Sequence, residues 1–294
     1  MKSKSDSVPV LRLYGSFVKY KLSLAVAFSS ATGYIICCNK ADRGLFAVTI
    51  AVFLLASGSA ALNEVQEKFQ DGIMDRTRER PIPSGKLSLE RARTIVTLLL
   101  ISGGILCLFS GIYPFLLGIS CIFLYNYLYT YLKSKSIFAV IPGALVGAIP
   151  PVIGFVAAGG SISDLKIVTF SAFMFLWQLP HFWLVILKYR DDYSRAGFKT
   201  IGLYLDDKQI RKLVICWVLL TSLFILIFFC LSNVFGKYFA RIILVLNPVF
   251  VVIFAKTLLP AGEEFRFRST FIILNSFGLL VMIALIVDSI LKGA

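Results

Sequence analysis

The sequence predicts an all-helical membrane protein, a polytopic bundle with nine transmembrane helices. The chain has 294 residues, 58% of them are hydrophobic, and the mean hydropathy is +0.83. Hydrophobic runs of about 20 residues, the length that a helix needs to cross a bilayer, recur along the whole chain. These runs are continuous rather than alternating, and a spanning segment must satisfy its own backbone hydrogen bonds. Helices are therefore expected, and a β-barrel is not.

The expected spans follow the apolar runs in chain order, and two of them carry signals for helix packing. The second span contains small residues around Gly58, and the fifth contains Gly143 and Gly147 in a GxxxG spacing, so both can approach neighbouring helices closely. Pro150 and Pro151 are expected to kink the fifth span. The nine spans are expected near 22-40, 45-63, 93-111, 113-132, 138-158, 166-187, 213-233, 239-258 and 270-291.

The basic residues indicate an orientation, because cytoplasmic connections hold an excess of Lys and Arg. If the N-terminus is inside, 24 of the 30 basic residues fall at the inner end of the bundle and 6 at the outer end. The sequence therefore predicts a cytoplasmic N-terminus and an outer C-terminus. Residues 1-294 are expected to form a single transmembrane domain with two long charged loops, near 63-92 and 188-212, on the cytoplasmic side.

The sequence also indicates the location of the protein and limits the classes of partner that are expected. The first apolar run begins only near residue 22 and is long enough to remain as a span, so it does not read as a signal peptide. A multi-pass protein of a bacterial inner membrane is expected. The positive-inside bias accounts for most of the net charge of +14, so nucleic acid is not an expected partner.

An acidic stripe follows the second span. Asn63, Glu67, Asp71 and Asp75 recur every four residues, which places them along one face of a helix. Like charges at this spacing destabilise a helix by a few tenths of a kcal/mol per pair unless a cation offsets them. Oxygen ligands of this kind suit Mg²⁺, which takes one or two carboxylates and completes its shell with water and substrate phosphate. The stripe is therefore a candidate magnesium site.

Basic side chains directly follow this stripe. Arg76, Arg78 and Arg80 precede the helix-ending sequence PIPSG, after which Ser88 can cap the next helix. A diphosphate group needs metal ions on some of its oxygens and Arg or Lys on the others. The first loop is therefore a candidate diphosphate site. A solvated charged loop with Glu/Arg pairs within the helix is the alternative interpretation.

Two further segments bring the same ingredients to the same membrane face. Lys133 and Lys135 end the fourth span there, although ordinary anchoring at the membrane surface is the alternative interpretation for both. The second long loop contains KYRDDYSRAGFKT at 188-200. Its charged residues are Asp191, Asp192, Lys188, Arg190, Arg195 and Lys199. Three separate segments thus form a candidate polyanion site on one side of the membrane.

His181 is the only histidine in the chain and lies in WQLPHFW within the sixth span. Polar residues inside a membrane are functional candidates. One imidazole could ligate a heme iron or contact a heme propionate, and a hydrogen bond to a neighbouring helix is the alternative interpretation. A single histidine excludes a bis-histidine cytochrome.

Taken together, these motifs resemble those of the UbiA family of intramembrane prenyltransferases. Members of that family carry an NxxxDxxxD motif after span two and a second acidic motif after span six. The residues that carry the resemblance are NEVQEKFQDGIMDRTRERP at 63-81, PGALVGAIPPVIGF at 142-155 and LWQLPHFWLVILKYRDDYSRAG at 176-197. The last of these is most similar to the heme branch of the family, the protoheme IX farnesyltransferases that make heme O.

The resemblance implies Mg²⁺-dependent transfer of a farnesyl group from farnesyl diphosphate to a vinyl group of heme B, in a site surrounded by membrane lipid. The implied catalytic residues and metal ligands are Asn63, Glu67 and Asp71 for one Mg²⁺ and Asp191 with Asp192 for a second. The implied diphosphate ligands are Arg76, Arg80, Lys133, Lys188 and Arg190, and His181 is the candidate for heme binding. Candidates for shielding the allylic cation by cation-π contact are Tyr125, Tyr129 and Phe175.

Two positions depart from the family pattern. Glu67 stands where the family more often has Asp, and Phe69 stands where many members of the heme branch have another Asp. Glutamate keeps the carboxylate but moves it one methylene outward. An aromatic quinone precursor is the alternative acceptor. A transporter of an anionic metabolite is the alternative from another class, but transporters tend to place charge at the bilayer midplane, whereas this chain concentrates it on one face.

Overall fold

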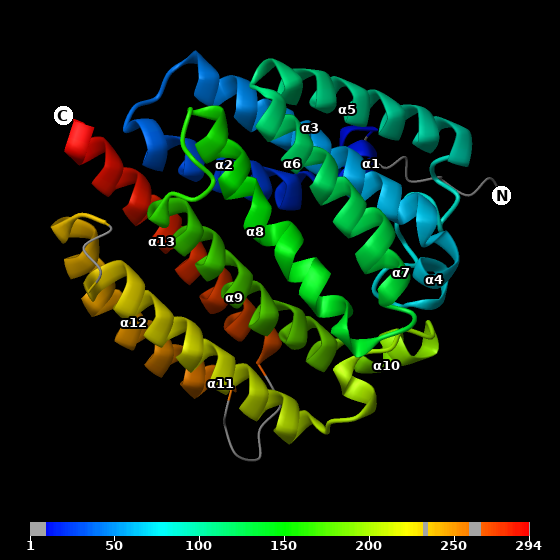
Figure 1. Cartoon of the computed structure of the whole chain (residues 1–294). Helices are drawn as coiled ribbons and strands as arrows, with labels where there is room; N and C mark the ends of the chain where they lie inside the picture. Colours follow the sequence, from blue (N-terminus) through cyan, green and yellow to red (C-terminus); the bar gives the residue numbers. More distant parts are fainter. Residues whose placement is uncertain (1–9, 232–234, 259–265, 294) are drawn as a thin grey trace.

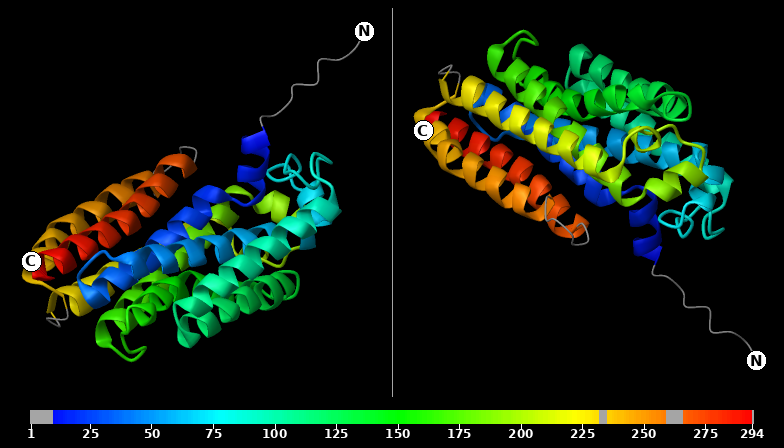
Figure 2. Two further views of the ribbon diagram at one scale, coloured as in Figure 1. Left: turned by 90° about the horizontal axis from the view of Figure 1, so that it is seen from above. Right: turned by 90° about the horizontal axis from the view of Figure 1, so that it is seen from below.

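The structure is a computed structural model that describes residues 10–231, 235–258 and 266–293. Every regular element in these ranges is a helix. The long helices run side by side in one bundle, with α4 (Lys68–Ile73) and α10 (Arg190–Arg195) at one end and the end of α13 (Phe267–Gly293) at the other (Figure 1). The two views of Figure 2 show the same separation of the two ends.

Within the described residues, nine helices are long and apolar enough to cross a membrane, which confirms the predicted fold class. The end predicted for the seventh span, at 232 and 233, lies outside those residues. The spans are α2 (Tyr20–Cys38), α3 (Arg43–Gln66), α5 (Leu89–Phe109), α6 with η1 and α7 (Ile112–Leu132), η2 with α8 (Ile137–Ala157), α9 (Leu165–Lys188), α11 with part of η4 (Asp207–Ile227), α12 (Lys237–Leu258) and α13 (Phe267–Lys292).

Capping residues set where several of these helices begin. Asp206 accepts a hydrogen bond from the backbone N–H of Gln209 (2.8 Å) while the Gln209 side chain accepts one from the Asp206 N–H (2.9 Å), so α11 starts well before its apolar run. Ser88 caps α5 in the way the sequence predicts. Hydropathy marks the part of a helix that lies in the bilayer, whereas the caps mark its ends.

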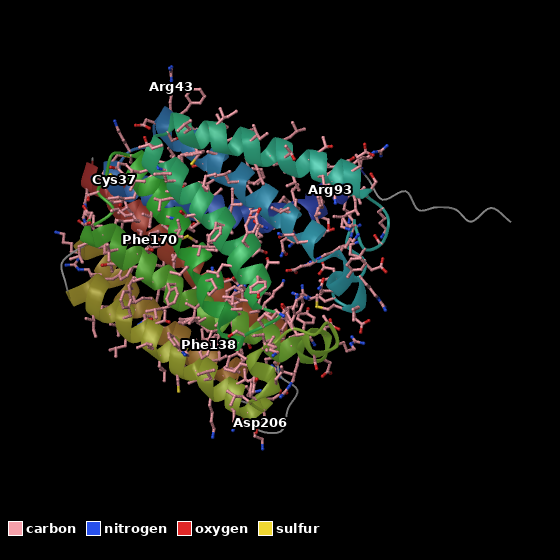
Figure 3. The ribbon with its side chains drawn as sticks, turned by 45° about the vertical axis from the view of Figure 1, so that its right-hand side comes forward. Cys37, Arg43, Arg93, Phe138, Phe170 and Asp206 are labelled. Atoms are coloured by element: carbon pink, nitrogen blue, oxygen red, sulfur yellow. The ribbon has the colours of Figure 1, made fainter. Side chains whose placement is uncertain are left out.

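The helices alternate in direction, so their connections gather at two ends. Figure 3 shows Cys37 and Arg43 at one end and Arg93 and Asp206 at the other. The charged loop after α3, the end of α7 and the loop after α9 all lie at the same end as α1 (Val10–Phe17) (Figure 1). This arrangement agrees with the predicted convergence of three charged segments.

Close backbone contact between α2 and α8 depends on two glycines. A Cβ atom added to Gly33 would overlap with the Pro151 carbonyl group, and one added to Gly154 would overlap with the Ser30 carbonyl group. Small residues let helix backbones approach in this way. Pro150 and Pro151 lie inside α8, as the sequence predicts. Helices α2 and α8 both line the cavity described below, so their separation affects its width.

Gly154→Ala is expected to destabilise the fold, because its methyl group meets backbone rather than a flexible side chain. Overpacking of this kind costs about 1–3 kcal/mol. The measurement is the thermal unfolding midpoint in detergent. Gly72→Ala is the matched control, since a Cβ atom at Gly72 meets nothing within 4 Å. An unchanged midpoint for Gly154→Ala would show that α2 and α8 are not in backbone contact.

Candidate active site

Three members of the acidic stripe stay on one buried face at the junction of α3 and α4. Asn63, Glu67 and Asp71 expose 4%, 5% and 0% of their surface. The Glu67 N–H donates to the Asn63 carbonyl (3.0 Å) and the Asp71 N–H to the Glu67 carbonyl (2.8 Å), so the helical spacing continues through the junction. The Asn63 amide also donates to Glu67 Oε1 (2.8 Å). Asp75 leaves the stripe, because α4 ends at Ile73.

Two basic side chains predicted to bind a diphosphate lie directly on these carboxylates. Arg80 Nη1 contacts both oxygens of Asp71, at 2.8 and 2.7 Å. Lys133 Nζ forms an ion pair with Glu67 Oε1, and the two side chains are only 13% and 7% exposed. Burial lowers the pKa of Lys133, and the Glu67 carboxylate opposes that shift. The structure thus brings residues from two of the three charged segments, the first loop and the end of α7, into one buried ion-pair network.

Two further charged residues lie close to this network, and the sequence did not predict them. Lys19 joins α1 to α2 in a left-handed conformation (φ 48°). Burial, reinforced by the Arg80 charge and opposed by Glu64, Glu67 and Asp71, lowers the pKa of Lys19 to about 7. Glu64 is fully buried, its Oε1 accepts a hydrogen bond from the Ile82 N–H (3.1 Å), and its Oε2 has no hydrogen-bond partner among the described residues.

The sequence signals for these two residues were weak. Glu64 falls outside the four-residue period of the acidic stripe, and Lys19 is one of several basic residues near the N-terminus. Spacing along one helix identifies residues that share a face, but it does not identify residues from other segments that pack against that face. The network therefore contains three carboxylates, Glu64, Glu67 and Asp71, beside the basic residues Lys19, Arg80 and Lys133.

The second charged loop is joined to the first by Asp192. Its two carboxylate oxygens accept hydrogen bonds from the backbone N–H groups of Asp75 (3.2 Å) and Arg76 (3.1 Å), 117 and 116 residues away in the sequence. Burial raises the pKa of Asp192, but the hydrogen bonds from Arg76, Arg195 and Asp75 outweigh it and hold that pKa below its usual value. Asp191, the other predicted ligand in this loop, is exposed.

Arg190 and Lys188 are not brought to the acidic stripe. Arg190 donates to the carbonyls of Gly202 and Leu205 and to the Asp207 carboxylate, so its guanidinium holds the turn before α11. Lys188 is exposed at the end of α9. The sequence predicted that both bind the diphosphate. The charge of these two residues alone does not predict where their side chains lie. The fold of the turn at 201–207 decides the direction of the Arg190 side chain.

A cavity of about 290 Å³ extends from the charged end into the bundle. Arg76 and Tyr193 line it at the charged end, and Val52, Gly118 and Ile153 line it deeper inside. Most of its lining side chains are apolar. The helices that contribute are α2, α3, α6, η1, α8, α9 and α10. The cavity can therefore take a long apolar group whose polar end lies beside Arg76 and Tyr193.

The π-helical segment η1 (Phe123–Tyr129) places two tyrosines in the cavity wall. The rings of Tyr125 and Tyr129 stack with centroids 5.5 Å apart, and the Tyr125 hydroxyl lies 3.5 Å from Asn63 Oδ1. Asn126 fixes this segment by donating to the Ser59 carbonyl of α3 (2.9 Å). π-Helical turns are frequent at functional sites. Phe175, the third predicted aromatic, packs against the hydrophobic core and is not among the cavity-lining residues.

His181 lies in the cavity wall on α9. Its ring packs against Phe271, with centroids 4.7 Å apart. Its Nδ1 atom is buried and has no hydrogen-bond partner among the described residues. A buried polar atom without a partner carries a desolvation cost of about 1–3 kcal/mol, and a ligand that reached this nitrogen would remove that cost.

The donor set of the stripe fits Mg²⁺. No group of three or more His, Cys, Asp or Glu side chains in the described parts of the chain is arranged to hold a metal ion. The stripe offers instead two carboxylates and one amide, Glu67, Asp71 and Asn63, which are hard oxygen donors on one face. Mg²⁺ commonly uses only one or two carboxylates and leaves its other positions to water and substrate phosphate.

A membrane bundle with an apolar cavity below a buried network of carboxylates and basic side chains defines an enzyme for amphiphilic substrates with an anionic head. The model of the UbiA prenyltransferase family matches residues 23–283. The chain belongs to the UbiA prenyltransferase family and is a prenyltransferase, which confirms the resemblance predicted from the sequence.

Three similar proteins illustrate this membership. A protoheme IX farnesyltransferase from Nitratidesulfovibrio vulgaris is 35% identical over 202 residues, covering 68% of this chain and 70% of that protein. One from Flavobacterium psychrophilum is 29% identical over 293 residues and covers 97% of both chains. The solved structure of a UbiA homolog from Archaeoglobus fulgidus, bound to GPP and Mg²⁺, has a TM-score of 0.74 at 16% identity and covers 94% of this chain and 99% of that one. It shares the fold.

Proposed function

We propose that the protein transfers a farnesyl group from farnesyl diphosphate to a vinyl group of protoheme IX, heme B, giving heme O. The curated relatives named protoheme IX farnesyltransferase support this assignment. The observation that carries it is one continuous cavity that runs from the charged end, at Arg76 and Tyr193, to His181. Its volume of about 290 Å³ lies just below the usual range for ligand pockets, about 300–1,000 Å³, so it has room for one prenyl chain and the vinyl edge of the heme rather than for both whole substrates.

The proposed magnesium ligands are Asn63, Glu67 and Asp71. Bound there, Mg²⁺ would draw negative charge from the leaving diphosphate. Arg80 and Lys133 hold the two carboxylates in position and lie close enough to turn toward the diphosphate oxygens. Lys19 is a third basic side chain close to the same carboxylates, and it is proposed to bind the diphosphate in its protonated form.

The cavity wall controls what happens after the allylic C–O bond breaks. The faces of Tyr125 and Tyr129 stabilise the farnesyl cation, an interaction worth about 2 kcal/mol when desolvated. The apolar lining keeps water away until a vinyl carbon of heme B attacks the cation. This attack leaves a cation on the vinyl carbon next to the porphyrin ring. Water adds to that carbon, and loss of a proton from the added water completes the hydroxyethylfarnesyl side chain. His181 binds the acceptor, either as an axial ligand of the heme iron or as a hydrogen-bond donor to a propionate.

The orientation and location follow from the same charges. The charged end, which carries α1 and the three basic segments, faces the cytoplasm, because basic residues accumulate on that side. A bacterial inner membrane is the proposed location, and residues 1–294 are proposed to act as one transmembrane domain. The family match over 23–283 supports the last point.

The acceptor is tested by incubating the purified chain with farnesyl diphosphate, hemin and Mg²⁺, and by analysing the products by mass spectrometry. Heme O is the expected product, formed together with diphosphate. A prenylated aromatic quinone precursor, made from supplied 4-hydroxybenzoate in the absence of any heme O, would contradict the heme assignment but not the prenyltransferase class.

His181→Ala is expected to weaken hemin binding by at least tenfold, because the variant loses the only imidazole in the cavity wall. The measurement is a titration followed by the Soret absorbance of hemin. Binding of farnesyl thiodiphosphate, an unreactive donor analogue, serves as the internal control and is expected to change by less than twofold. Unchanged hemin affinity would leave His181 with a packing role against Phe271.

A further inference from the structure

Two glycines of α8 make room for side chains in the cavity wall. A Cβ atom added to Gly143 would meet the rings of Phe182 (3.0 Å) and Tyr129 (3.1 Å). One added to Gly147 would lie 2.5 Å from Nε2 of Gln178. All five residues line the cavity. The GxxxG spacing of α8 therefore opens space for cavity-lining side chains, whereas the sequence predicted that it brings helices close together.

Gln178 differs from other polar side chains in the cavity wall. The Ser59 hydroxyl donates to Asn126 Oδ1, and Arg76 donates to the Tyr193 hydroxyl. Gln178 is partly exposed on the cavity side of α9, and its amide forms no hydrogen bond within the described part of the chain. An amide offers both donor and acceptor atoms. This side chain can therefore hold a small polar ligand in a largely apolar wall.

A backbone carbonyl of α8 lies next to this amide. Proline has no N–H group, so Pro150 leaves the Val146 carbonyl without the partner that a helix supplies four residues later. Val146, Gly147 and Pro150 all line the cavity, which places this carbonyl on the cavity side of α8. Carbonyls that proline frees in membrane helices are satisfied by neighbouring side chains or by ordered water. A buried water needs about two to four polar partners, and the Gln178 amide and the Val146 carbonyl provide two.

These two groups lie at the depth where the new carbon–carbon bond forms. The rings of Tyr129 and Phe182 have centroids 6.0 Å apart. Tyr125 and Gln178 each lie four residues before one of these rings, on helices that run toward the charged end, so both are about one turn deeper. Tyr125 is a proposed shield of the allylic cation. The heme propionates are anions and belong beside Arg76 at the charged end, so Gln178 faces the vinyl edge.

We propose that Gln178 holds the water that completes the acceptor chemistry, with the Val146 carbonyl as the second partner of that water. The farnesyl carbon bonds to the terminal vinyl carbon through the electron pair of the vinyl double bond, which leaves the positive charge on the carbon next to the porphyrin. The held water gives an oxygen lone pair to that carbon and then loses one proton, which the released diphosphate accepts. This inference rests on the proposed function and assigns a residue to its last step.

The test is a product ratio on the purified full chain with farnesyl diphosphate, hemin and Mg²⁺, measured by chromatography and mass spectrometry. Without the held water, the cation loses a proton from the neighbouring CH₂ group and gives an alkene that is lighter than heme O by one water. Gln178→Met keeps the length of the side chain and removes the amide. It is expected to raise the ratio of alkene to heme O at least about tenfold, because the water loses a hydrogen bond. An unchanged ratio would overturn the inference.

Two glycine variants test the same position without changing Gln178 itself. Gly147→Ala is expected to raise the ratio as well, because its methyl group displaces the amide nitrogen. This variant keeps the test decisive if Gln178→Met fails to fold. Gly143→Ala is the matched control, since its methyl group meets Phe182 and Tyr129 instead. It is expected to change the rate and to leave the ratio within about twofold. An equal rise in both glycine variants would show general distortion of the cavity and overturn the inference.

The outcomes separate this inference from the proposed function. Heme O without any alkene from Gln178→Met and Gly147→Ala would overturn the role of Gln178 and leave the proposed function in place. No farnesylated porphyrin from the unaltered chain would contradict the proposed function, and the step assigned to Gln178 with it.

Discussion

Asp71→Asn is expected to lower kcat/KM for farnesyl transfer by about a hundredfold to a thousandfold, the loss typical of removing a principal electrostatic contact to the reacting group. Asp71 is fully buried, and Arg80 contacts both of its oxygens. The asparagine keeps the shape but removes the charge that the proposed Mg²⁺ and Arg80 both require. The measurement is release of diphosphate from farnesyl diphosphate in the presence of hemin.

Glu79→Gln is the control for this variant, because it removes a carboxylate from the same loop at an exposed position. It is expected to retain activity within a factor of two. Turnover of Asp71→Asn close to that of the unaltered protein would show that the acidic stripe is a structural ion-pair network and that the diphosphate binds elsewhere.

Lys133→Met has the second largest expected effect, because it breaks a buried ion pair. Removing one partner of such a pair costs about 3–5 kcal/mol, since the other charge stays buried alone. Lys133 and Glu67 are 13% and 7% exposed, so this cost applies. We expect a lower thermal unfolding midpoint and at least a hundredfold loss of transfer activity.

Two variants separate the stability effect from the activity effect. Glu67→Gln combined with Lys133→Met removes both charges and is expected to recover much of the thermal stability while remaining inactive. Lys135→Met changes an exposed lysine in the same segment and is expected to retain stability and activity. Full activity of the double variant would contradict the proposed roles of both residues.

The membrane fold could be predicted from the sequence because each span is a continuous apolar run, and the bilayer fixes the length of such runs. The ends of the helices were harder to predict from the sequence. The first turns of α5 and α11 are polar, so hydropathy placed both starts too late, whereas the caps at Ser88 and Asp206 set them. The break after Ile73 removed Asp75 from a stripe that the four-residue period would have continued.

The candidate site was predictable to the extent that its residues repeat along one helix. Asn63, Glu67 and Asp71 share a face because they are four residues apart, and spacing alone indicates that. The partners that come from other segments were harder to predict. Lys19 and Glu64 joined the network through packing, and the turn at 201–207 took Arg190 away from it. Contacts of this kind depend on the tertiary fold, and local pattern does not encode them.

The central claim is that Asn63, Glu67 and Asp71 hold a divalent ion that contacts the prenyl diphosphate. The most direct test is electron-nuclear double resonance on Mn²⁺ bound to the full chain with farnesyl thiodiphosphate. A ³¹P hyperfine coupling to the bound Mn²⁺ is expected, and this coupling is expected to disappear in Asp71→Asn. Tightly bound Mn²⁺ without any ³¹P coupling, or a coupling that persists unchanged in Asp71→Asn, would contradict this claim.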